Sequence, residues 1–170
     1  VIDAIRTAIR FGNVAARQGA HVDIEESFKD ETHVLNANRN RLVQLFLNLI
    51  QNALQAMPDG GTLFIRASHR TENGQLIGHY EVQDTGVGIA PEHIHKVFDP
   101  FFTTKDPGEG TGLGLALCYS IVQDLKGSMS VESTVNVGTR FFIEIPLTGL
   151  KIIDPNEEPG TEKKTPRTAS

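Results

Sequence analysis

The sequence has little cysteine and no long apolar run. Its single cysteine, Cys118, excludes an internal disulfide, and because it lies in an apolar stretch we expect a buried structural thiol. No apolar stretch approaches the ~20 residues that span a bilayer, and the N-terminus lacks the charged-then-apolar pattern of an export signal. We therefore expect a cytoplasmic domain that makes no membrane contact, either alone or as the cytoplasmic part of a membrane-anchored protein.

An excess of positive charge is also absent. The chain has 16 Lys and Arg against 21 Asp and Glu, for a formal net charge of −5. Nucleic acids and anionic membranes attract clusters of basic residues, so neither is an expected partner. The 170 residues, 39% apolar and 22% charged, are typical of one globular domain with a tail. We expect a domain over 1–150 and a disordered tail over 151–170, where Pro, Glu, Lys, Thr and Ser dominate.

The common nucleotide-binding and kinase motifs are missing as well. There is no GxxxxGK[ST] sequence, which excludes a P-loop NTPase, and no GxGxxG helix start of the kind that binds dinucleotides. The HRD and DFG motifs of serine/threonine kinases are absent too. Any nucleotide chemistry must therefore use a different arrangement.

Apolar residues recur at helical spacing in some segments and alternate in others. We interpret the stretches 21–26 and 32–35 as an edge hairpin. The pattern as a whole predicts an α/β sandwich in which helices cover one face of a mixed sheet. The predicted helices span 2–17, 40–57 and 113–125, and the other predicted strands span 62–67, 77–83, 128–132 and 139–146.

Two asparagines flank the apolar stripe of the second predicted helix. Asn48 and Asn52 are four residues apart and so lie one turn above the other. Neutral amide oxygens can ligate Mg²⁺ beside a triphosphate without adding negative charge. Taken alone, the pair also fits two solvated amides on a helix surface.

An acidic residue ends a predicted strand and enters a glycine turn at Asp84-Thr85-Gly86-Val87-Gly88-Ile89. A carboxylate there can accept a hydrogen bond from the exocyclic amine of adenine. Guanine carries a keto oxygen at that position and lacks this donor. Gly86 and Gly88 permit a backbone that approaches a ligand closely. An ordinary turn after a strand is the alternative interpretation.

A second glycine-rich segment leads into the last predicted helix. Gly110, Gly112 and Gly114 leave backbone N–H groups and the positive end of the helix available to phosphate. Lys105 lies in the loop before them and can reach a phosphate, although exposed loop lysines are usually just solvated. We expect Phe98, Phe101 and Phe102 to anchor this loop, which spans 99–111.

These segments, in this order, resemble the N, G1, F and G2 boxes of sensor histidine kinases, within the wider superfamily that includes gyrase. The resemblance covers nearly all of 1–146. It implies the Bergerat fold, with a mainly antiparallel sheet and a flexible lid over ATP and Mg²⁺. It implies metal ligation by Asn52 and Asn48, with Lys105 as a third catalytic residue. The nucleotide-binding residues that it implies are Asn52, Gln55, Ala56, Asp84, Gly86, Gly88, Ile89, Phe98, Phe102, Lys105, Gly110, Thr111, Gly112, Leu113, Gly114, Leu115 and Thr139.

The sequence departs from the family pattern at two positions. Gln55 and Ala56 stand where many members carry a lysine and an aromatic residue. Because that lysine is absent, we expect Lys105 to be the cation that contacts phosphate. Because the aromatic residue is absent, we expect aliphatic residues such as Ile89 to cover the adenine. The resemblance also implies that Thr139, after Gly138, supports the adenine-binding acid.

The phosphoryl acceptor is the remaining question. None of the six histidines lies in the H-E-x-x-x-P context of a phosphoacceptor helix. We therefore expect the acceptor on a separate helical hairpin, a response regulator as an indirect partner, and a monomeric isolated domain. A serine-directed anti-sigma kinase or a gyrase-like ATPase is an alternative, but such proteins place a glutamate base where this chain has Asn48. A degenerate nucleotide-binding scaffold is another.

Overall fold

The computed structural model describes residues 1–16, 21–28, 31–104 and 111–152. Its elements, in chain order, are α1 (Ile2–Ala16), β1 (Val22–Phe28), β2 (Glu31–Val34), α2 (Arg39–Ala56), β3 (Gly61–Glu72), β4 (Gln75–Asp84), α3 (Pro91–Ile94), α4 (Gly114–Asp124), β5 (Ser128–Thr134), β6 (Gly138–Pro146) and β7 (Gly149–Ile152).

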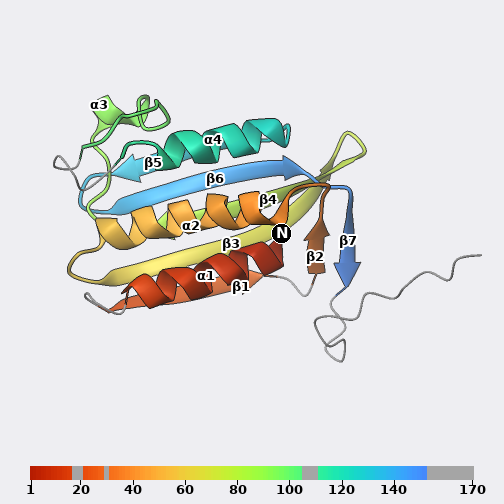
Figure 1. Ribbon diagram of the computed structural model, residues 1–170, viewed down its shortest axis with the longest axis horizontal. Helices are drawn as coiled ribbons and strands as arrows, with labels where there is room; N and C mark the ends of the chain where they lie inside the picture. Colours follow the sequence, from red (N-terminus) through yellow and green to blue (C-terminus); the bar gives the residue numbers. More distant parts are fainter. Residues whose placement is uncertain (17–20, 29–30, 105–110, 153–170) are drawn as a thin grey trace, which may run out of the picture.

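Two layers make up the molecule. The main sheet has five strands in the order β1-β3-β4-β6-β5. β1 is parallel to β3, and every other neighbouring pair in this sheet is antiparallel. The helices α1, α2 and α4 lie side by side on one face of the sheet, with α2 between the other two (Figure 1). The predicted two-layer sandwich with a mixed, mainly antiparallel sheet is confirmed.

The second helix, α2, forms the centre of the helical layer. Asn38 caps it, because the Asn38 side chain accepts a hydrogen bond of 2.9 Å from the N–H of Asn40. The helix ends just before Pro58, which cannot continue it. Burial of a large apolar side chain contributes about 1.5–3 kcal/mol, and the buried residues of α2 are Leu42, Leu45, Phe46, Leu49, Ile50 and Ala53.

The single cysteine is part of this core. Cys118 lies on α4 and is fully buried, and its Sγ donates a hydrogen bond of 3.5 Å to the carbonyl of Leu45 on α2. Burial raises the pKa of the Cys118 thiol to about 12. The prediction of a buried structural thiol is confirmed.

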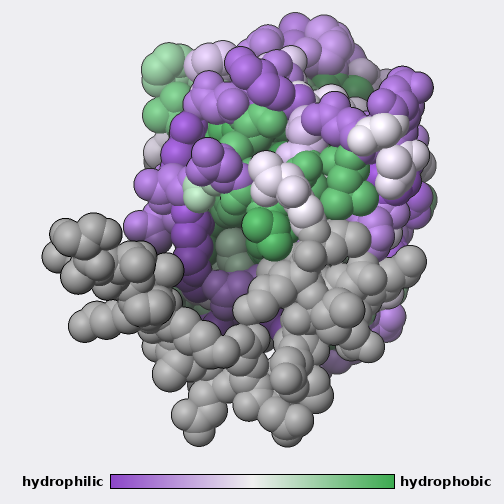
Figure 2. All heavy atoms as spheres, turned by 90° about the vertical axis from the view of Figure 1, so that its right-hand side faces the viewer, coloured by the Kyte–Doolittle hydropathy of each residue, from purple (hydrophilic) through white to green (hydrophobic). Residues whose placement is uncertain are grey.

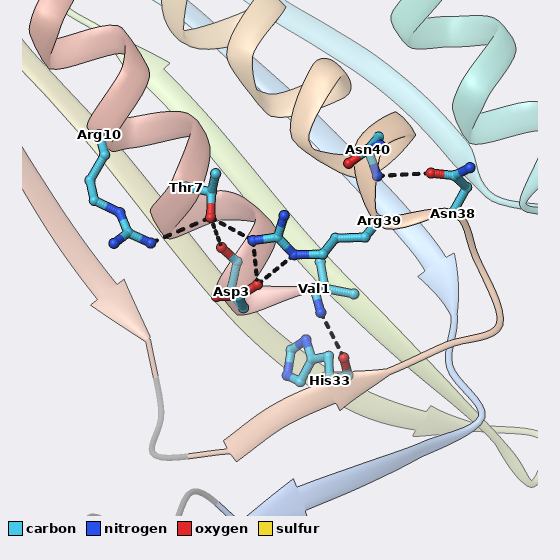
Figure 3. Close-up of polar contacts among 8 residues, drawn as sticks. All are labelled: Val1, Asp3, Thr7, Arg10, His33, Asn38, Arg39 and Asn40. Carbon is cyan, nitrogen blue, oxygen red and sulfur yellow. Dashed lines mark hydrogen bonds and ion pairs between the residues drawn. The ribbon is translucent and has the colours of Figure 1, made fainter. Parts of the chain in front are cut away.

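Polar contacts fix the start of α1 against α2 and β2 (Figure 3). The Arg39 guanidinium donates to the Asp3 carboxylate at 2.8 Å and to the Thr7 hydroxyl at 2.9 Å. The nitrogen of Val1 donates to the carbonyl of His33 at 2.9 Å. These contacts link the N-terminal parts of α1 and α2 and join the start of α1 to β2.

The predicted edge hairpin is wrong. β1 instead pairs in parallel with β3, where Ile24 lies beside Leu63, and β2 pairs with β7 in a separate two-stranded sheet. Parallel pairing lets Val22 and Ile24 pack against the core of the main sheet. The partner of β2 lies more than 100 residues away, which a local pattern cannot reveal.

Regular structure extends past the boundary that we expected at Leu150. β7 continues to Ile152, and the N–H and hydroxyl of Thr148 both donate to the carbonyl of Val34, at 2.8 and 3.1 Å. The remaining tail, 153–170, lies outside the described residues. Figure 2 shows the end of the molecule that carries β2 and β7, where hydrophobic residues reach the surface among hydrophilic ones.

None of the helices in the described ranges has the length and apolar character that crossing a membrane requires.

Candidate functional site

A cavity of about 600 Å³ lies beside α2, at the end of the sheet where β4 finishes and β6 begins. Binding sites for small molecules commonly measure about 300–1,000 Å³. One wall is polar and comes from α2, and apolar side chains make much of the rest. The lining residues are Asn48, Gln51, Asn52, Gln55, Ala56, Asp84, Val87, Gly88, Ile89, Val97, Phe102, Thr103, Thr104, Thr111, Gly112, Gly114, Leu115, Thr139 and Phe141.

Asp84 is the buried carboxylate of this cavity. It is the last residue of β4 and only 4% exposed. The N–H of Gly86 donates to its Oδ1 at 2.9 Å, and the N–H of Thr139 donates to the same oxygen at 3.2 Å. Burial raises the pKa of the Asp84 carboxyl above its usual range, and the two N–H groups offset part of that rise. The site thus contains a desolvated acid held by backbone donors.

The glycines after Asp84 allow its loop to pack closely. A Cβ atom on Gly86 would lie 2.3 Å from the carbonyl oxygen of Ala56, and one on Gly88 would lie 2.2 Å from that of Thr134. Gly88 also has a φ of +71°, which favours glycine. The N–H of Val87 donates to the carbonyl of Ala56 at 2.9 Å. The loop therefore packs against the C-terminal end of α2 on one side and against β5 on the other.

The two asparagines of α2 face the same cavity as Asp84. The Asn48 amide nitrogen donates to the carbonyl of Gly114 at 3.3 Å, at the first residue of α4. Asn52 lies one turn further along the cavity wall. Within the described ranges, no group of three or more His, Cys, Asp or Glu residues could hold a metal ion. The amide groups of Asn48 and Asn52 offer neutral oxygen donors to a cation on this wall of the cavity.

The N-terminus of α4 closes another side of the cavity. Leu113 precedes the helix and makes no side-chain capping bond, so the N–H groups of the first turn remain available. Gly114 and Leu115, in this turn, line the cavity. A helix N-terminus of this kind attracts anions through its N–H groups and its partial positive charge.

The three phenylalanines before the glycine-rich segment differ in their surroundings. Phe98 packs against Tyr119 and Phe141, with ring centroids 5.3 and 6.4 Å apart, and Phe102 lines the cavity. Phe101 is 75% exposed, so its ring does not anchor the loop as expected. Its backbone does so instead, because its N–H donates to the carbonyl of Gly112 at 2.9 Å.

Most of the predicted site residues meet at this cavity. Gly86, Phe98 and Leu113 do not line it. Gly86 packs against Ala56 and Phe98 against Phe141, which do line it, and Leu113 is exposed. Lys105 and Gly110 lie outside the described residues, as does part of the predicted lid. The lining residues that the sequence did not reveal are Gln51, Val87, Val97, Thr103, Thr104 and Phe141. Gln51 could have been found from its position in the turn between Asn48 and Asn52.

Ser133 on β5 is a further residue that the sequence did not single out. Its hydroxyl contacts the backbone N–H of Ile89, the carbonyl of Gly138 and the hydroxyl of Thr139. Thr139 supports Asp84 through its backbone N–H, while its hydroxyl is directed to Ser133. One serine in an alternating strand carries no local signal of such a role.

Known proteins with similar sequences share this region. Residues 37–149 match the family described as histidine kinase-, DNA gyrase B-, and HSP90-like ATPases. Sporulation kinase A of Bacillus subtilis is 38% identical over 123 residues, which are 72% of this chain and 19% of that protein. Sensor histidine kinase ZraS of Escherichia coli O157:H7 is 36% identical over 126 residues, 74% of this chain and 26% of that protein. The chain thus spans only about a fifth to a quarter of these relatives.

Solved structures agree with the sequence matches. The catalytic domain of histidine kinase ThkA superposes with a TM-score of 0.68 at 31% identity, covering 86% of this chain and 91% of that one. Full-length ShkA in complex with AMPPNP superposes with a TM-score of 0.69 at 26% identity, covering 85% of this chain and 29% of that one. The matched segment includes every residue that lines the cavity, from Asn48 to Phe141, and well over half of the sequence. The chain therefore belongs to the family of histidine kinase-, DNA gyrase B- and HSP90-like ATPases.

Proposed function

We propose that this domain binds ATP with Mg²⁺ in the cavity beside α2 and donates the γ-phosphoryl group to a histidine outside this chain. The buried carboxylate of Asp84 carries the proposal. Its Oδ1 accepts both backbone N–H groups, which leaves Oδ2 as the acceptor for a ligand within the described part of the chain. An exocyclic amine such as that of adenine matches this acceptor, and a keto oxygen does not.

The opposite side of the cavity suits a triphosphate. The uncapped N-terminus of α4 offers backbone N–H groups, and Thr111 and Gly112 lie beside it in the cavity wall. Lys105 and Gly110 remain proposed phosphate contacts. The similarity to ShkA, which was crystallised with AMPPNP, an ATP analogue, supports a nucleotide in this position.

The α2 amides fit a magnesium ion held jointly with phosphate. Mg²⁺ favours oxygen ligands and usually takes only one or two from the protein beside phosphates and water. The amide oxygens of Asn52 and Asn48 are such ligands, and the described residues offer no carboxylate cluster that would compete for the ion. When bound, the ion neutralises charge on the phosphates during transfer.

The acceptor must come from another segment, because none of the six histidines lines the cavity. In the transfer, an imidazole nitrogen forms a bond to the γ-phosphorus while the bond to the bridging oxygen breaks and ADP leaves. The Asn48 amide cannot serve as a general base. This favours an imidazole nucleophile over the serine or water of the alternative enzymes. The relatives are sensor kinases several times longer, which supports a phosphoacceptor hairpin, a response regulator and a cytoplasmic role in two-component signalling.

Calorimetric titration of ATP with and without Mg²⁺ tests the proposal. We expect Asn52→Ala to weaken binding of Mg–ATP about tenfold, or ~1.4 kcal/mol, and to leave binding of metal-free ATP unchanged. Asn40→Ala is the matched control, because Asn40 is an exposed amide at the start of the same helix. Equal losses with and without Mg²⁺, or no loss at all, would contradict the metal assignment. Absence of ATP binding by the unmodified chain would contradict the function itself.

A further inference from the structure

The hydroxyl of Ser133 joins three parts of the wall behind the cavity. Its Oγ lies 2.8 Å from the nitrogen of Ile89, in the loop after β4. It lies 2.9 Å from the carbonyl oxygen of Gly138 and 2.9 Å from Oγ1 of Thr139, both on β6. Ser133 itself does not line the cavity, whereas Ile89 and Thr139 do.

Only one arrangement of protons makes all three contacts hydrogen bonds at the same time. A carbonyl oxygen only accepts, so the single proton of the Ser133 hydroxyl goes to Gly138. A backbone N–H only donates, so Ile89 uses one of the two lone pairs of the serine oxygen. The second lone pair then accepts the proton of the Thr139 hydroxyl. Ser133 has no further donor to offer Thr139.

This arrangement has a consequence for the cavity. With its proton committed to Ser133, the Thr139 hydroxyl can act toward a ligand, or a water beside it, only as an acceptor. Asp84, whose Oδ1 accepts the N–H of Thr139, is the neighbouring acceptor. Two adjacent acceptors favour the exocyclic NH₂ group of adenine, which has two protons to donate, over the keto oxygen that guanine carries at the same position.

We propose that Ser133 is a positioning residue for base selectivity: it turns the Thr139 hydroxyl into an obligate acceptor and thereby strengthens the preference for adenine over guanine. The proposal rests on the nucleotide-binding function proposed above. In the absence of the serine hydroxyl, the Thr139 proton is free to point into the cavity, where it can donate to the keto oxygen of guanine.

Affinities for ATP and GTP, measured by titration with the whole chain, test this proposal. We expect Ser133→Ala to lower the ratio of ATP to GTP affinity about 5- to 10-fold, the size of one hydrogen bond. Ser133→Thr keeps a hydroxyl on a β-branched residue that suits a strand, and we expect it to restore the ratio. Ser130→Ala is the matched control: Ser130 is exposed on the same strand, and its hydroxyl makes no hydrogen bond within the described ranges.

A double variant separates selectivity from general damage to the fold. In a Thr139→Val background there is no hydroxyl to orient, so we expect Ser133→Ala to leave the ratio unchanged there. Circular dichroism melting identifies a variant that fails to fold, in which case Ser133→Cys, of similar shape but with a weak donor, replaces it and should lower the ratio.

The outcomes distinguish this proposal from the function on which it rests. A wild-type chain that binds neither nucleotide, or both equally, overturns the proposed function. A wild-type preference for ATP that Ser133→Ala leaves intact overturns the role of Ser133 alone. An equal fall in affinity for ATP and GTP would show that the serine only supports the fold.

Discussion

Two buried polar groups on the same face of β4 differ in what surrounds them. Asp84 ends the strand, is held by backbone N–H groups, and opens onto the cavity. Tyr80, four residues earlier, is fully buried, and its hydroxyl lies 2.8 Å from Nδ1 of His33 on β2. The Tyr80 ring packs edge-on against that of Phe46, with ring centroids 5.7 Å apart. A second histidine, His69, packs edge-on against His33, with ring centroids 5.4 Å apart. One group faces a space that a ligand can fill, and the other is enclosed by the chain.

The difference shows what a buried titratable group can be used for. Burial raises the pKa of Asp84, whose second oxygen is left to meet a ligand. Burial lowers the pKa of His33 to about 4, with the neighbouring His69 adding to the effect, and the ring is paired with Tyr80. Changes at Asp84 should therefore alter ligand binding, and changes at His33 or Tyr80 should alter stability.

The largest effect should follow Asp84→Asn. The new amide oxygen can still accept the N–H groups of Gly86 and Thr139, but its NH₂ group presents a donor where the ligand needs an acceptor. We expect ATP affinity to fall about 100-fold, or ~2.7 kcal/mol, with a smaller loss for GTP and little change in melting temperature. Titration of both nucleotides measures this.

The control for Asp84→Asn is Asp59→Asn, at an exposed aspartate after α2. It should bind both nucleotides as the unmodified chain does. If Asp84→Asn lowers ATP and GTP affinity equally, or lowers the melting temperature as much as a core substitution, the carboxylate supports the fold and does not recognise the base.

The next effect concerns the pH dependence of stability at His33. Its pKa falls from 6.5 to about 4 on folding, so between these values the unfolded chain binds more protons. The free energy of unfolding should therefore decrease as pH falls from about 6.5 to about 4. At ~1.36 kcal/mol per pKa unit the decrease is at most ~3.4 kcal/mol, and local rearrangement should reduce it to about 2 kcal/mol.

Urea unfolding at several pH values measures this decrease, and His33→Asn isolates it. Asparagine keeps a polar group near the Tyr80 hydroxyl but does not titrate. Asp84 contributes with the opposite sign, because its raised pKa lets the folded state take up a proton first. The difference between the two chains removes that contribution. Identical pH profiles would show that His33 is already accessible to protons in the folded state.

The smallest effect should follow Tyr80→Phe. The substitution removes the hydroxyl and leaves Nδ1 of His33 without this partner. We expect the free energy of unfolding to fall by about 1 kcal/mol, with ATP affinity unchanged. Thermal melting and ATP titration measure the two quantities. Tyr119→Phe, at a tyrosine that is 39% exposed, should change neither. A loss of ATP affinity in Tyr80→Phe would mean that the two ends of β4 are coupled.

Local patterns in the sequence predicted the elements that bury one apolar stripe or one alternating face. α2, α4, β4 and the β5–β6 pair lie within two residues of their expected ranges, whereas β3 continues to Glu72, five residues beyond its predicted end. The site residues were identified from their places on these elements. Asn48 and Asn52 lie on a predicted helix, Asp84 ends a predicted strand, and the glycine segments follow that strand or precede the last helix. Phe101 was misinterpreted, because a sequence of aromatic residues does not show which ring is buried.

The sequence by itself determined the two layers, the order of the chemical groups along the chain and the family resemblance, since these depend on local periodicity and spacing. Tertiary structure decided the rest. The parallel pairing of β1, the joining of β2 to β7 and the placing of Ser133 behind Thr139 bring together residues from separate segments. The direction of a hydroxyl proton or the pKa of a buried acid depends on those neighbours in space.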